Sequence, residues 1–72
     1  MDVSWVNVQF DFDNEVMFDK TLDKGIERIS IGSDTIKIFY NESSKREATY
    51  LKVIIINSII GYEYPTVRGE GI

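Results

Sequence analysis

The stretch from Tyr50 to Ile60, YLKVIIINSII, limits the fold of this chain more than any other. Seven of its eleven residues are Leu, Val or Ile, and six of those seven are β-branched. β-branched side chains are stiff at χ1 and pack well on a pleated sheet, so the run predicts a strand with a break at Asn57-Ser58. Both faces of this strand are apolar apart from Lys52. That pattern predicts a central strand, or one whose second face is covered by a helix or by another subunit.

A strict alternation of residue types runs from Val6 to Asp13. The even positions are Val or Phe and the odd positions are Asn, Gln or Asp, which is typical of a half-buried strand. Asp13-Asn14 is suitable tight-turn chemistry, after which residues 15–18 are expected to return as a second strand. Val3 and Trp5 fall on the polar face of the alternation. A large aromatic on such a face marks an interface more often than a core, which makes Trp5 a candidate contact residue.

The segment 19–29 fits two structures. Phe18, Leu22 and Ile26 have helical spacing, and Asp19 is a suitable N-cap. Gly25 argues against a helix, because glycine in a helix interior costs about 1 kcal/mol relative to alanine. A loop with at most one helical turn is therefore the preferred interpretation, and a short helix is the alternative.

The remaining patterns complete an all-β fold. Further strands are predicted at residues 26–31, 35–40 and 59–64, with a turn at 32–34 and a polar connection at 41–47. Together, the predicted strands and turns indicate an all-β fold: a small antiparallel meander of five to six strands, closed as a rolled sheet or barrel. An α+β fold with one short helix around 19–29 is the runner-up. Residues 1–64 are expected to form a single domain and residues 65–72 a flexible C-terminal tail.

Composition narrows the classes of function. The chain has 72 residues, no Cys and no His, so disulfides, thiolate metal sites and the commonest general base are absent. We therefore expect a protein that is not an enzyme and uses no cofactor or metal. A core this small is marginal, and self-association, most simply a homodimer, is the remaining source of stability. No signal-peptide pattern and no apolar run of about 20 residues occurs, so a soluble cytoplasmic protein without membrane contact is expected.

Negative charge is concentrated in the first third of the chain. The formal net charge is −4 overall, −5 for residues 1–23 and +1 for residues 24–72. The acidic residues surround the predicted turn, which leaves three interpretations: a solvated hairpin, a surface that binds a basic partner, or a site for a hard cation. The cation interpretation is the weakest. In an EF-hand calcium loop that began at Asp11, the twelfth position would need a Glu, and this position is Leu22. The residues predicted to bind a partner are Trp5, Asp11, Asp13, Glu15 and Asp19.

The function expected from these features is that of a small acidic protein-interaction module. It would inhibit or modulate a partner or host protein that has a basic surface, for example by mimicking the charge of nucleic acid. Small phage-encoded proteins that modulate host proteins share this size and charge, which is an analogy of composition alone.

The alternative function is a small barrel that binds single-stranded nucleic acid by stacking and local positive charge. The residues that would carry it are Tyr40, Tyr50, Lys37, Lys45, Arg46 and Lys52. The overall acidity disfavours this alternative, because nucleic-acid binding depends on neutralising phosphates.

Overall fold

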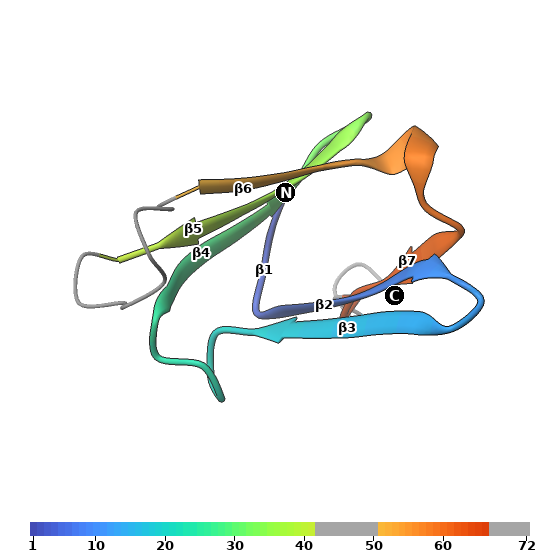
Figure 1. Cartoon of the computed structure of the whole chain (residues 1–72). Helices are drawn as coiled ribbons and strands as arrows, with labels where there is room; N and C mark the ends of the chain where they lie inside the picture. The colour runs from blue at the N-terminus through green and yellow to red at the C-terminus, as the bar shows by residue number, and fades with distance from the viewer. Residues whose placement is uncertain (42–50, 67–72) are drawn as a thin grey trace.

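The computed structural model describes residues 1–41 and 51–66, which form two antiparallel β-sheets that face each other (Figure 1). The four-stranded sheet has the order β1-β4-β5-β6, and the three-stranded sheet has the order β3-β2-β7. The four-stranded sheet contains β1 (Asp2–Val3), β4 (Ile26–Ile31), β5 (Thr35–Tyr40) and β6 (Leu51–Ile55). The three-stranded sheet contains β2 (Trp5–Asp11), β3 (Asn14–Asp19) and β7 (Gly61–Glu63). A single 3₁₀ turn, η1 (Ile56–Ser58), follows β6, where the sequence predicted a break.

The prediction of a small all-β antiparallel fold is confirmed, and the helix considered for residues 19–29 is absent. Residues 20–25 form turns instead, in which the Asp23 N–H donates to the Asp19 carbonyl at 2.8 Å. The Asp19 carboxylate also accepts the N–H groups of Thr21 and Leu22, at 2.8 and 3.3 Å. These local bonds satisfy the backbone of one turn, and Gly25 then precedes β4. Most of the polar connection at 41–47 and part of the C-terminal tail lie outside the described residues.

The N-terminal strand is divided at Ser4, because the chain passes there from one sheet to the other (Figure 1). β1 pairs with β4, with Val3 opposite Ile29, whereas β2 belongs to the three-stranded sheet. This division gives seven strands in the described part of the chain, one more than the five to six expected. It also changes which face a residue occupies. The prediction that Val3 lies on the polar face is wrong, since its side chain is only 9% exposed and belongs to the core.

One hydrophobic core lies between the two sheets. Its fully buried side chains are all β-branched and come from both layers: Val6, Val8, Ile29, Ile36 and Ile38. Among the described residues no polar or charged side chain is buried with them. The alternation seen in the sequence therefore reflects a core face and an outer face on each sheet.

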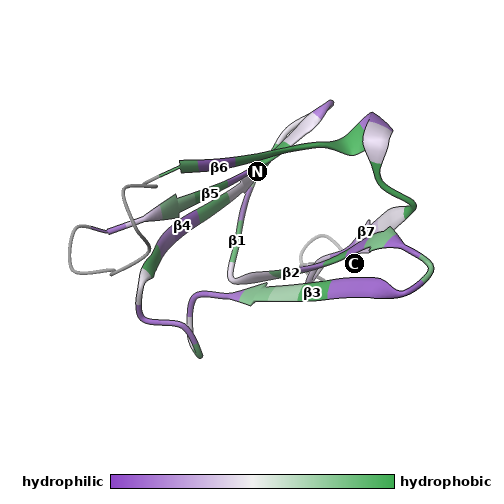
Figure 2. Cartoon of the chain, viewed as in Figure 1, coloured by the Kyte–Doolittle hydropathy of each residue, from purple (hydrophilic) through white to green (hydrophobic). Residues whose placement is uncertain are grey.

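The prediction that the Tyr50–Ile60 run forms a central strand is wrong. Within the described part of the chain, β6 pairs with β5 alone and forms the edge of the four-stranded sheet. A two-layer fold buries one face of each sheet, so only Ile54 of β6 is buried. Figure 2 shows β6 as a largely hydrophobic strand on the outside of the molecule. Its exposed apolar side chains, which we call the outer row of β6, are Leu51, Val53 and Ile55, exposed by 44%, 47% and 49%.

Candidate functional site

The outer face of the three-stranded sheet is the candidate functional site. The pairing registers of β2 with β3 and with β7 place the alternate, outward-facing residues of these strands side by side. We call this surface the acidic face, and it consists of Trp5, Asn7, Gln9, Glu15, Met17, Asp19, Gly61 and Glu63. The set contains three carboxylates and no basic side chain. It therefore has a net charge of about −3 at neutral pH.

Two carboxylates of the acidic face lie on either side of β2. Glu63 of β7 is opposite Asn7, and Glu15 of β3 is opposite Gln9. The Asn7 amide donates a hydrogen bond to Oε2 of Glu15, which fixes the orientation of that carboxylate. Glu15 and Glu63 are both exposed to solvent. The sheet thus aligns two anionic groups from distant parts of the sequence.

A shallow hollow of about 300 Å³ lies between these two carboxylates. Its lining residues are Asn7, Gln9, Glu15, Ile60, Gly61, Tyr62 and Glu63. Gly61 contributes to the opening because it has no side chain, and a Cβ at this position would have no neighbouring heavy atom within 4 Å. Acceptor groups around a space of this size suit the end of an Arg or Lys side chain.

Apolar side chains lie on the same face as the carboxylates. Trp5 is half-buried and lies opposite Asp19, and Met17 is 51% exposed and lies opposite Asn7. The position of Trp5 on the outer face agrees with the sequence interpretation. Met17 gave no sequence signal, because a single Met in a short strand is equally compatible with either face. Glu63 was also missed, since only the β2–β7 pairing brings it to this face.

Asp11 and Asp13 lie beside the acidic face, at the β2–β3 turn. The Asp13 N–H donates to the Asp11 carboxylate at 2.9 Å, so one of the predicted contact residues also stabilises the turn. A bulge between Gln9 and Asp11 shifts the register, and the turn residues are Phe12-Asp13 instead of Asp13-Asn14. The alternation predicted that Phe12 faces the core. That prediction is wrong, because Phe12 occupies the turn and is 91% exposed.

The five predicted contact residues therefore divide into two neighbouring groups. Trp5, Glu15 and Asp19 belong to the acidic face, and Asp11 and Asp13 adjoin it at the turn. One oxygen of Asp19 is already used by the backbone of residues 21 and 22. Glu15 accepts its hydrogen bond from another side chain, that of Asn7, whereas Asp11 and Asp19 accept from backbone N–H groups.

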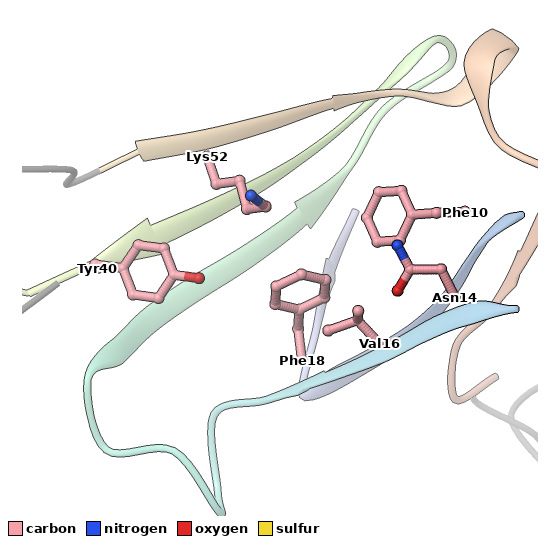
Figure 3. Close-up of a pocket in the computed structure, with 6 residues that line it drawn as sticks. All are labelled: Phe10, Asn14, Val16, Phe18, Tyr40 and Lys52. Carbon is pink, nitrogen blue, oxygen red and sulfur yellow. The ribbon is translucent and has the colours of Figure 1, made fainter.

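A second opening, a cleft of about 430 Å³, lies between the two sheets (Figure 3). Its apolar walls and polar ends are formed by Phe10, Asn14, Val16, Phe18, Tyr40 and Lys52. Lys52 extends into this space from the four-stranded sheet and Asn14 from the three-stranded sheet. The cleft is the open side of the core, where the two layers diverge.

The residues considered for nucleic-acid binding do not form one surface in the described part of the chain. Tyr40 is buried in the wall of the cleft, and Lys52 points to the same interior side. Lys37 lies on the outer face of β5, opposite Val53. Tyr50, Lys45 and Arg46 lie outside the described residues.

Among the described side chains, no group of three or more Asp or Glu residues is placed to hold a metal ion. No helix within residues 1–41 and 51–66 is long and apolar enough to cross a membrane. Comparisons with protein-family models, with curated proteins and with solved structures find no match to this chain.

Proposed function

We propose that this chain is a non-enzymatic interaction module that binds a basic surface of another protein through the acidic face. The observation that carries the proposal is the placement of Glu15 and Glu63 on either side of one hollow. An Arg or Lys of the partner would enter this hollow and donate charge-assisted hydrogen bonds to both carboxylates. Asp11 and Asp13 at the adjoining turn would extend the negative field.

Trp5 and Met17 supply the apolar part of the proposed contact. Interfaces combine a few apolar anchors with a charged periphery, and Trp is among the residues most enriched at their energetic centres. Both side chains lie on the acidic face and are at least partly accessible. A surface that offers negative charge and apolar anchors together is suited to specific binding as well as to electrostatic attraction.

The proposed effect on the partner is inhibition or modulation. A small protein that occupies a basic surface excludes other anionic ligands from it, including nucleic acid, whose charge the acidic face would imitate. We favour binding over catalysis because the carboxylates of the acidic face lie on an open sheet, where water screens them. We propose that the protein acts in the cytoplasm. The chain has no cysteine, so its fold does not depend on disulfides, which form in oxidising compartments.

We also propose that the binding unit is a homodimer. The core is built from short strands of only two layers, and an exposed apolar edge remains on β6. Burial of that edge between two copies would add to the apolar area removed from water.

The test is differential capture of proteins from a nuclease-treated lysate. Three baits are compared: the wild type, Glu15→Gln with Glu63→Gln, and Glu27→Gln with Asp34→Asn. The last pair removes the same charge from exposed positions of β4 and of the β4–β5 turn. We expect one stoichiometric partner on the wild type and on the Glu27/Asp34 variant, and its loss from the Glu15/Glu63 variant. Equal capture by all three baits would contradict the proposal, and capture only when nucleic acid is intact would favour the nucleic-acid alternative.

A further inference from the structure

In the described part of the chain, the open edge of β6 carries its exposed apolar side chains and its outward-pointing main-chain groups on the same three residues. The Ile56 N–H donates to the Asp34 carbonyl at 3.0 Å, and the register pairs Ile54 with Ile36. Main-chain groups of successive residues in an antiparallel strand point alternately to the two sides. Those of Ile56, Ile54 and Lys52 therefore point to β5, and those of the outer row of β6 point away from it.

An independent contact supports this assignment. The Ser58 hydroxyl donates to the Ile55 carbonyl at 2.8 Å, which places that carbonyl on the side away from β5. The other main-chain groups of the outer row have no strand beside them in the part of the chain that the structure describes. An edge of this kind, with exposed aliphatic side chains, is a template for pairing with another strand.

We infer that β6 pairs antiparallel with β6 of a second copy, in the register that places Val53 opposite Val53 of the other copy. This inference rests on the proposed self-association, to which it gives a surface and a register. The two four-stranded sheets then join into one continuous sheet of eight strands. The outer row packs against itself, with Leu51 of one copy opposite Ile55 of the other.

Charge and the length of the paired segment together select this register among those that the backbone directions allow. A register centred on Lys52 would place two ammonium groups directly opposite each other, which is destabilising. A register centred on Ile54 would pair only residues 53–55 of each strand. The register centred on Val53 pairs all five residues of β6 and places Lys52 opposite Ile54.

Charge also makes β6 a surface at which two copies of this acidic chain can meet. β6 contains no acidic residue, although the chain as a whole has a net charge of −4. Contact through any part of the acidic face would bring like charges together. Contact through β6 keeps the acidic faces on the other layer of each copy, so both remain available and the dimer would have two binding surfaces.

The test is the oligomeric state of three proteins, measured by sedimentation velocity over a range of concentrations. We expect the wild type to dimerise and Val53→Glu to be monomeric, because two carboxylates would then face each other across the symmetry axis. Lys37 lies opposite Val53 within the same sheet, so the substituted carboxylate has a partner in the folded monomer. Met17→Glu, which adds the same charge at a similarly exposed strand position, should remain dimeric.

Cysteine cross-linking tests the register without relying on a destabilising charge. The chain has no cysteine, so each variant carries a single thiol. Under dilute oxidation Val53→Cys should form a covalent dimer rapidly, because this residue faces its own copy at a spacing that a disulfide can bridge. Leu51→Cys and Met17→Cys should cross-link at least 10-fold more slowly.

Each outcome decides a different point. A wild type that stays monomeric at every concentration would overturn both the self-association and the β6 interface. A dimer that survives Val53→Glu, or that cross-links equally at Met17, would overturn the β6 interface and leave self-association standing. None of these results depends on partner binding at the acidic face, which is measured separately by capture with the Glu15/Glu63 variant.

Discussion

Glu63 lies directly opposite Asn7 in the pairing of β7 with β2. Asn7 in turn holds the carboxylate of Glu15 through its side-chain amide, so one residue of the middle strand lies next to an acid on each side. This relationship converts scattered acidic residues into an organised anionic surface. It depends on β7, whose contribution comes from the opposite end of the sequence from β2 and β3.

Removal of the two flanking charges should weaken partner binding by about 100-fold or more, since each of the two charge-assisted contacts contributes about 1.5–3 kcal/mol. The variant is Glu15→Gln with Glu63→Gln, and binding of the captured partner is measured by calorimetry. The free energy of unfolding should change by less than about 1 kcal/mol, because both side chains are exposed. An equal loss in the Glu27→Gln, Asp34→Asn variant would show that net charge, and not this surface, governs binding.

Filling the hollow should block binding without loss of charge. Gly61→Val adds a branched side chain where a Cβ meets no heavy atom within 4 Å, so the fold should accept it. Val also has a higher strand propensity than Gly, and thermal unfolding should show equal or greater stability. Unchanged partner affinity in this variant would mean that the hollow is not the contact point.

The acidic turn should act on the rate of association. Asp11→Asn with Asp13→Asn keeps a side-chain oxygen at Asp11 for the Asp13 N–H and removes two peripheral charges. Peripheral charges mainly steer encounter, so the association rate constant should fall while the dissociation rate constant changes little. Surface plasmon resonance at two salt concentrations measures the association and dissociation rate constants separately. A dominant change in dissociation would instead place the turn within the buried contact.

Trp5→Ala should affect binding more than folding. Trp5 is half-buried on the acidic face, whereas Ile36 is fully buried in the core. We expect Trp5→Ala to reduce the free energy of unfolding by less than Ile36→Ala, for which core truncation costs about 2–5 kcal/mol. Chemical denaturation of both variants provides the comparison. A Trp5→Ala variant as unstable as Ile36→Ala would assign Trp5 to the core and remove it from the proposed contact.

Local patterns predicted much of this fold, because β-branching and alternation report burial on one side of a strand. The strands around residues 6–11, 26–31 and 35–40 followed from such patterns, as did the break at Asn57-Ser58, which lies within η1. The β6 edge position did not, since an apolar run looks the same whether its second face is covered or exposed. The change of sheet at Ser4 also has no local signal, which is why Val3 was placed on the wrong face.

Part of the candidate site was also predicted, because alternation shows which residues of one hairpin share a face. Trp5, Glu15 and Asp19 are close in sequence and share one hairpin, so alternation was sufficient to group them. Glu63 joins them only through the β2–β7 pairing, and Phe12 left the core because of a bulge that shifts the register. Long-range pairing and bulges depend on packing of the whole molecule, and a local pattern does not report them.

The most direct measurement is an amide chemical-shift titration of the ¹⁵N-labelled protein with an arginine-rich peptide as a defined basic probe. The largest shifts should occur at Asn7, Glu15, Gly61 and Glu63, and should be lost in the Glu15→Gln, Glu63→Gln variant. Shifts of equal size over both sheets, or a response that the double variant retains, would contradict binding at the acidic face.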